Sequence, residues 1–128
     1  KSNIKMQIHN AKIKDEFDNR LIEFSLKIIK LCNEIRKDRN LWSVADQLIR
    51  CATSIGANIF EAKASSSRLD FKKYFEIALK SANETKYWLT IVREVCPHLK
   101  DQVEDCFQEA TEFSKIIGAG VLTMKGRR

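Results

Sequence analysis

The chain has 128 residues, of which 44% are hydrophobic, and it carries a formal net charge of +6. This length and apolar content suit one domain that buries its own core without help from a metal or a disulfide. One proline, four glycines and no sustained alternation of apolar and polar residues favour an all-α fold over a β fold. There is neither an apolar run of about 18 residues nor a signal-peptide pattern. We therefore expect a soluble, cytoplasmic protein with no membrane partner.

The positive charge is concentrated at the two ends of the chain. Four lysines precede the first acidic residue, and Lys125, Arg127 and Arg128 close the chain, which leaves 16 basic against 17 acidic residues at positions 15 to 124. Residues 19–93 hold 14 basic and 8 acidic side chains, whereas residues 97–117 hold 2 basic and 5 acidic ones. This uneven distribution suits docking between subunits or onto a polyanion.

Four segments have the three- and four-residue spacing of apolar side chains that is typical of amphipathic helices. The spacing predicts helices at about residues 17–37, 44–64, 70–95 and 97–117. Short polar connections and Pro97 separate them, so we expect an antiparallel up-down-up-down four-helix bundle over residues 15–120. Residues 1–14 are expected to form a flexible basic arm and residues 121–128 a basic tail, with Gly118 and Gly120 ending the fourth helix.

The predicted second helix carries a polar stripe beside an apolar seam. The seam consists of Leu48, Ala52, Ile55, Ile59 and Ala62, and the stripe of Gln47, Arg50, Ser54, Asn58 and Glu61. One interpretation places the stripe on a solvated outer face. The other has it meet Ser81 and Glu84 of the third helix in a buried network that fixes the helix register, with Glu84 or Glu61 pairing a buried Arg50.

Gly56 lies inside this helix, where glycine costs about 1 kcal/mol relative to alanine. We interpret it as the point at which a neighbouring helix approaches closely. The alternative is a slightly weakened helix with no special role.

The sequence offers no pattern typical of catalysis, of a metal site or of a cofactor site. The cysteines, Cys32, Cys51, Cys96 and Cys106, lack metal-ligand spacing and are expected to be reduced packing residues. His9 and His98 accompany no recognisable nucleophile, and no phosphate-binding glycine loop occurs. We predict no catalytic, cofactor-binding or metal-binding residues and a protein that is not an enzyme.

A cluster of basic residues surrounds the predicted connection between the second and third helices. It contains Lys63, Arg68, Lys72 and Lys73, with Asp70 as the one acid opposing it. Together with Arg127 and Arg128 at the chain end, these are the candidate contacts to nucleic-acid phosphates. The alternative is a solvated turn.

The second and third helices carry motifs that resemble a known family. The motifs are Arg50, Ser54-Ile55, Asn58-Ile59 and Glu61, then Phe71, Phe75, Ile77-Ala78, Ser81, Asn83-Glu84-Thr85 and Tyr87-Trp88-Leu89. They resemble the bacterial four-helix-bundle family of 23S rRNA intervening-sequence proteins, to which the accessory variability determinant of diversity-generating retroelements looks related. The resemblance covers residues 17–117. The family usually has glycine after Glu61, where this chain has Ala62.

The resemblance implies an antiparallel four-helix bundle that assembles into a homopentameric ring with a basic surface for nucleic acid. It also implies a reverse transcriptase as a partner, because the retroelement relatives act as accessory subunits of that enzyme. Members encoded within ribosomal RNA insertions have no settled biochemical role. Our leading hypothesis is a non-enzymatic homo-oligomer that binds the backbone of RNA or DNA, and the alternative is a structural or protein-binding scaffold.

Overall fold

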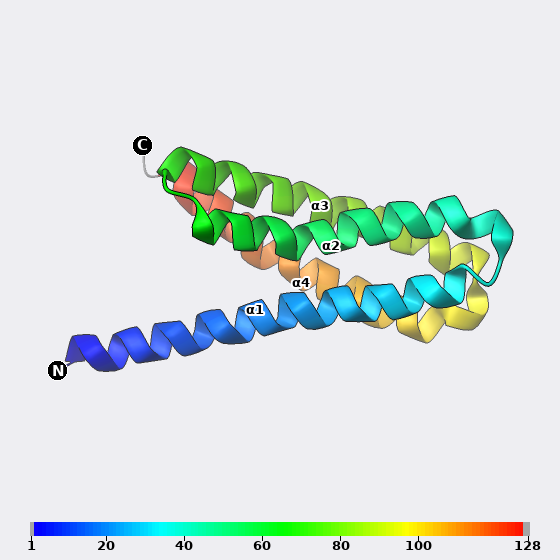
Figure 1. Ribbon diagram of the computed structural model, residues 1–128, viewed down its shortest axis with the longest axis horizontal. Coiled ribbons are helices and arrows are strands. Elements are labelled where there is room, and N and C mark those ends of the chain that lie inside the picture. The colour runs from blue at the N-terminus through cyan, green and yellow to red at the C-terminus, as the bar shows by residue number, and fades with distance from the viewer. Residues whose placement is uncertain (1, 127–128) are drawn as a thin grey trace.

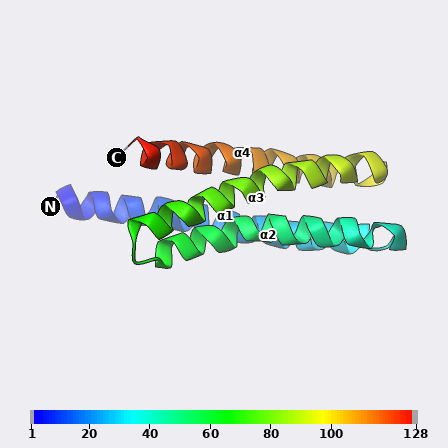
Figure 2. The ribbon, with the colours of Figure 1, turned by 90° about the horizontal axis from the view of Figure 1, so that it is seen from above.

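The computed structural model is all-α in the described part of the chain, with four long helices that lie side by side (Figures 1 and 2). The structure describes the backbone of residues 2–126 and the side chains of residues 16–126. The helices are α1 (Ser2–Ile35), α2 (Trp42–Ala64), α3 (Arg68–Val95) and α4 (Lys100–Lys125). Short 3₁₀ turns, Arg39–Leu41 and Pro97–Leu99, precede α2 and α4. None of the helices within residues 2–126 combines the length and the apolar content needed to cross a lipid bilayer.

The first helix is longer than the sequence predicted. It begins at Ser2, whereas a flexible arm was expected through residue 14 and a helix from about residue 17. Residues 2–35 contain neither proline nor glycine, so no residue of this stretch interrupts a helical backbone. The expected basic arm therefore has a helical backbone from Ser2 onward, and its flexibility stays a prediction.

The fourth helix also differs from the expectation at both ends. Pro97 opens a 3₁₀ turn rather than α4 itself, and α4 runs through Gly118 and Gly120 to Lys125. A Cβ at Gly120 would lie 3.1 Å from Cε2 of Phe75, so glycine at this position lets α4 stay close to α3. The prediction that these glycines end the helix was therefore wrong, and residues 121–125 of the predicted loose tail are helical.

The helix starts follow partly from local capping. Ser67 caps α3, because its side chain accepts a hydrogen bond of 3.0 Å from the backbone N–H of Asp70. At the preceding corner, α2 begins at Trp42, whose indole Nε1 donates to the carbonyl oxygen of Arg36 at 2.8 Å. The indole thereby ties the start of α2 to the end of α1.

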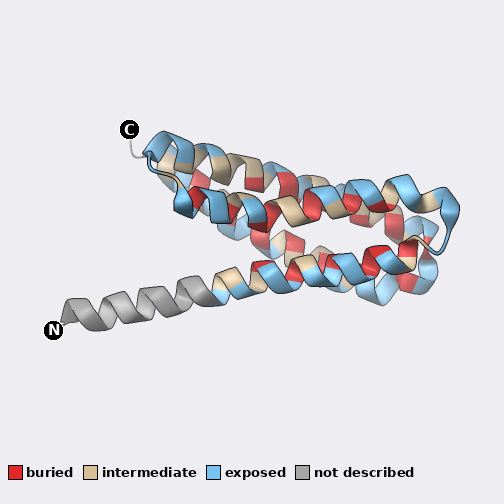
Figure 3. Ribbon diagram, viewed as in Figure 1, coloured by how far each residue is buried: buried red, intermediate tan, exposed pale blue. Residues whose placement is uncertain are grey.

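The core lies between the inner faces of the four helices (Figure 3). All five residues of the predicted α2 seam are at most 1% exposed, which confirms the apolar periodicity. Phe113 of α4 contacts Phe24 and Phe17 of α1 edge to face, with ring centroids 5.3 Å and 5.9 Å apart. The four cysteines are free and buried, as expected of packing residues.

Candidate nucleic-acid interface and polar network

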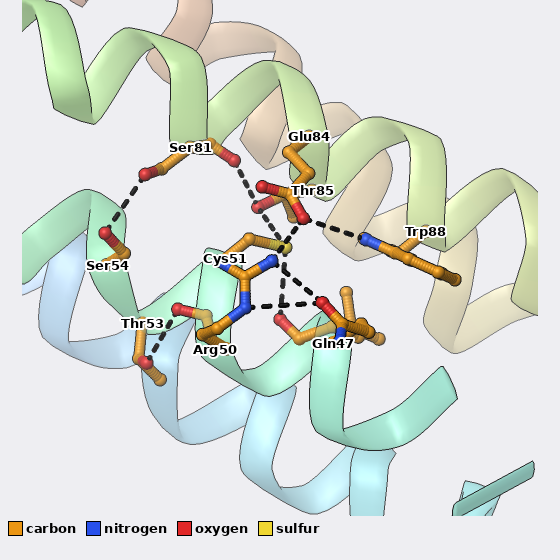
Figure 4. Close-up of polar contacts among 10 residues, drawn as sticks. Gln47, Arg50, Cys51, Thr53, Ser54, Ser81, Glu84, Thr85 and Trp88 are labelled. Atoms are coloured by element: carbon orange, nitrogen blue, oxygen red, sulfur yellow. Dashed lines mark hydrogen bonds and ion pairs between the residues drawn. The ribbon is translucent and has the colours of Figure 1, made fainter. Parts of the chain in front are cut away.

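The polar stripe of α2 meets α3 through an ion pair at its outer edge (Figure 4). Arg50 pairs with Glu84, and its guanidinium also donates to Oε1 of Gln47 at 2.9 Å. Glu84 in turn accepts a hydrogen bond of 3.1 Å from Nε1 of Trp88. Glu84 is thus one of the two carboxylates that the sequence offered as a partner, but the Arg50 side chain is 57% exposed, so the expected burial of Arg50 was wrong.

The inner part of the stripe links α2 to α3 by hydroxyl groups. Oγ of Ser81 donates to Oγ of Ser54 at 3.0 Å, and Nδ2 of Asn58 donates to the same Ser54 oxygen at 2.8 Å. Thr85, which is fully buried, donates to the Ser81 carbonyl at 2.7 Å and contacts Sγ of Cys51 at 3.5 Å. Of these contacts, Ser81 with Ser54 and Thr85 with Cys51 cross between α2 and α3, so these two pairs favour one register of the helices.

Gly56 and Glu61 complete the set of residues that the sequence singled out on α2. Gly56 is buried, and its close neighbour is Leu21 of α1, whose Cβ would lie 3.3 Å from a Cβ at position 56. Glu61 is exposed, and it forms no ion pair with the side chains described at residues 16–126. The structure therefore separates Glu61 from the network of Arg50, Ser54 and Asn58.

Lys63 differs from Arg68, Lys72 and Lys73 because it already has a carboxylate partner among the described side chains. Its ammonium pairs with Asp18 of α1, and its side chain is 33% exposed. The same ammonium lies 5.9 Å from the ring centroid of Phe60. The expectation that Asp70 alone opposes the basic cluster was wrong, because Asp18 is far from it in sequence and becomes its neighbour only in the folded chain.

Arg68, Lys72 and Lys73, which we call the basic corner, lie in the first two turns of α3. Arg68 and Lys72 are four residues apart and so share one face of the helix. No ion pair joins any of the three to another side chain described at residues 16–126. These three side chains can therefore bind an external anion more readily than Lys63, whose charge is partly neutralised by Asp18.

The C-terminal end of α4 lies at the same end of the molecule as the basic corner (Figure 1). Lys125 of α4 is 4.0 Å from a carboxylate oxygen of Glu76 on α3, which places the last turn of α4 beside the first half of α3. Arg127 and Arg128 lie outside the described residues.

The acidic residues of α4 have partners within the chain that sequence reasoning missed. Three ion pairs join α4 to α1 and α3: Glu109 with Arg20 at 2.7 Å, Asp105 with Lys27 at 3.0 Å, and Glu104 with Arg93 at 2.9 Å. The hydrogen bond with Asp105 is the main cause that raises the pKa of Lys27. The acid-rich helix therefore stabilises contacts inside one copy, and its charge is less available to a second copy than the sequence suggested.

The described residues offer little that could carry out chemistry. His98 is exposed beside Pro97, and residues 16–126 contain no group of three or more histidine, cysteine or acidic side chains placed to hold a metal ion. Burial raises the pKa of each cysteine thiol, which lowers its nucleophilicity at neutral pH. That the protein is not an enzyme stays a prediction.

The fold and the site define an all-α, four-helix protein whose basic corner forms no ion pair within residues 16–126 and whose α2 and α3 are linked by hydroxyl groups. The chain belongs to the 23S rRNA-intervening sequence protein family, whose sequence model matches residues 16–119. The structure is similar to the crystal structure of a protein of unknown function from the S23 ribosomal protein family of Bacteroides thetaiotaomicron. The two share 34% sequence identity and a TM-score of 0.75 over 81% of this chain and 96% of that one. No curated protein matches the chain significantly.

Proposed function

We propose that this protein is a non-enzymatic accessory protein that binds the sugar-phosphate backbone of RNA or DNA. The observation that carries the proposal is the basic corner, where Arg68, Lys72 and Lys73 have no carboxylate partner among the side chains described at residues 16–126. Each cation that meets a phosphate releases a counterion and adds affinity without base specificity. Lys63 would contribute less, because Asp18 already neutralises part of its charge.

The chain end is the second part of the proposed interface. The contact of Lys125 with Glu76 brings the end of α4 next to the first half of α3. Arg127 and Arg128 follow within three residues, so the chain can carry them toward the basic corner. The contact of Lys125 with Glu76 and the short sequence distance from Lys125 support including Arg127 and Arg128 among the proposed phosphate contacts.

In this proposal the helices alternate in direction and the protein works as a homo-oligomer, a ring of five copies. The opposite direction of α1 and α2 is supported by two ion pairs. Asp18 of α1 meets Lys63 near the end of α2, and Arg36, directly after α1, meets Asp46 near the start of α2. Several basic corners on one assembly would raise the affinity for a long polyanion by multivalency. The number five comes from the family resemblance.

The cellular role follows the same resemblance. We propose a cytoplasmic protein with a reverse transcriptase as a candidate protein partner and no membrane partner. The family description refers to an insertion in 23S rRNA, and we do not infer from it a role in the ribosome.

A salt series of nucleic-acid affinities tests this proposal. The variant Arg68→Gln/Lys72→Gln/Lys73→Gln removes three charges from the basic corner, and Lys30→Gln/Lys80→Gln/Lys100→Gln removes three exposed charges elsewhere. For duplex DNA, the slope of log affinity against log salt should become shallower by about 2 to 3 in the first variant and by much less in the second. Equal changes in both variants, or no binding at low salt, would argue against the basic corner.

Light scattering on a size-exclusion column tests assembly separately. We expect a mass of several copies at micromolar concentration, and a monomer would contradict the ring. If the protein assembles but binds no nucleic acid at any salt concentration, the scaffold function becomes the better explanation.

A further inference from the structure

A groove of about 320 Å³ lies between α1 and α2. It is lined by Ile22, Ser25 and Leu26 of α1 and by Gly56, Ala57 and Phe60 of α2, with no charged side chain. Ile22, Leu26 and Phe60 are 48%, 53% and 44% exposed, which is high for large apolar side chains that line one hollow. This volume lies at the lower end of the range of small-molecule sites, which are also lined mostly by apolar side chains.

The shape of the groove follows from the small residues of α2. Gly56 has no side chain and packs on Leu21, and Ala57 has only a methyl group. The larger side chains of Phe60 on α2 and Leu26 on α1 therefore project beyond Gly56 and Ala57 and form the two walls of the groove. The hollow thus has an aromatic ring on one helix and branched aliphatic side chains on the other.

A cation lies at the Phe60 end of this groove. Nζ of Lys63 is 5.9 Å from the Phe60 ring centroid, and the ion pair with Asp18 holds it there. A lysine ammonium has three N–H donors, so one bound to Asp18 can still donate to a phosphate. The basic corner begins at Arg68, directly after the short connection that follows α2.

Phe60 is the aromatic residue best placed to accompany these cations. The chain has 7 Phe, 2 Tyr and 2 Trp, all within residues 17–113. Of these, Trp42, Phe60 and Tyr87 are exposed large side chains. The Trp42 indole donates to the Arg36 carbonyl, and the Arg39 guanidinium lies 5.4 Å from its ring centroid. The Tyr87 ring packs on Trp88, with the ring centroids 5.1 Å apart. Phe60 has a lysine of the candidate interface beside its ring.

We propose that this groove holds an unpaired base of a single-stranded nucleic acid, which stacks on Phe60 while Lys63 and the basic corner contact the phosphates of the strand. A base has apolar faces and is tied to a phosphate, which matches an uncharged groove with a cation at its rim. The bases of a duplex stay stacked on one another and do not enter. This inference rests on the proposed nucleic-acid binding, and it specifies that the bound nucleic acid is single-stranded.

The test measures affinities of the full chain for three fluorescent probes at one salt concentration. The probes are a uridine strand, an abasic strand of the same length and phosphate number, and a duplex. The abasic strand should bind about tenfold more weakly than the uridine strand, because stacking on an aromatic ring contributes base-dependent affinity. Phe60→Leu keeps an apolar side chain but removes the ring, and it should abolish this tenfold difference. Tyr87→Leu, at an exposed aromatic residue of α3, should preserve it.

A second variant fills the groove without changing the ring. Ala57→Leu places a larger side chain on the exposed surface of α2 and should also abolish the difference between the uridine and abasic strands. Thermal melting and light scattering of each variant show whether the fold and the mass are preserved. If one of the two variants misfolds, the affinity difference between the uridine and abasic strands in the other variant still tests the inference.

Four outcomes overturn the inference. Equal affinity of the wild type for both strands, or an unchanged difference in Phe60→Leu, would exclude base stacking and leave backbone binding intact. A reduced mass in folded Phe60→Leu and Ala57→Leu, with the strand difference kept, would assign the groove to a contact between copies. If none of the probes binds, the proposed function fails as well.

Discussion

Gly56 of α2 lies against Leu21 of α1 so closely that a Cβ at position 56 would be 3.3 Å from the Leu21 Cβ. The Leu21 Cβ is attached to the backbone, and the residue is 1% exposed, so the contact can relax only if α1 moves. Alanine would gain about 1 kcal/mol of helix propensity, but overpacking typically costs about 1 to 3 kcal/mol. We therefore expect Gly56→Ala to lower the free energy of unfolding by about 1 kcal/mol in urea titrations.

Gly118 provides the matched control for this prediction. It also lies inside a helix, but a Cβ there would be 3.8 Å from Cδ1 of Leu79, an ordinary contact. Gly118→Ala should therefore raise the free energy of unfolding, by up to about 1 kcal/mol. If Gly56→Ala stabilises the protein as much as Gly118→Ala does, Gly56 is not a close-approach position.

The ion pair of Arg50 with Glu84 should contribute little to stability. Their side chains are 57% and 39% exposed, and an exposed pair is worth at most about 1 kcal/mol. A double-mutant cycle with Arg50→Ala and Glu84→Ala should give a coupling energy of about 0.5 kcal/mol that decreases at high salt. A coupling of several kcal/mol would mean that the pair is desolvated, for example by contact with another copy.

Phe113 should be far more sensitive to substitution than its neighbour Phe107. Phe113 is fully buried and contacts two phenylalanine rings of α1, whereas Phe107 is only partly buried. Phe113→Ala should lower the free energy of unfolding by about 3 to 5 kcal/mol. Phe107→Ala should cost clearly less in the same calorimetric or urea experiment, and similar losses would contradict the described core.

Two buried thiols should make the protein less stable at alkaline pH. Burial raises the pKa of Cys32 and of Cys106 from 9.0 to about 11, so the folded chain keeps protons that the unfolded chain loses. This contribution is fully present below pH 9 and is lost as the pH rises toward 11. Two pKa units correspond to about 3 kcal/mol for each thiol.

Urea titrations between pH 8 and about pH 10.5 measure this effect. The slope of unfolding free energy against pH should be less negative in Cys32→Ala/Cys106→Ala than in the wild type, because lysines and tyrosines titrate equally in both. Identical slopes would show that the thiols ionise without opening the fold.

Local patterns predicted the helices well because their causes are local. The α2 seam from Leu48 to Ala62 is buried since apolar spacing of three and four residues puts one stripe on one face. Ser67 caps α3 because its hydroxyl reaches an N–H three residues away. Gly120 misled the prediction, because its packing against Phe75 depends on a residue of another helix.

The candidate site was less predictable because its electrostatics depend on distant residues. Asp18 lies 45 positions before Lys63, and nothing in the local sequence indicates that they meet. The sequence offered Glu84 or Glu61 as the partner of Arg50, and it could not tell that Glu84 would be the one or that the pair would be open to solvent. Spacing along a helix fixes which residues share a face, whereas the exposure of that face depends on how neighbouring helices pack.

The contact between α1 and α4 has a consequence for how the chain folds. Arg20 and Glu109 are 89 positions apart, and Lys27 and Asp105 are 78 apart, whereas α2 packs directly on its sequence neighbours α1 and α3. Closing a longer loop costs more chain entropy, so helical hairpins form before the first helix meets the last. The α1–α4 contact should therefore form late in folding and should be the first contact to open near the midpoint of the unfolding transition. Amide hydrogen exchange should then be faster in α1 than in α2 and α3.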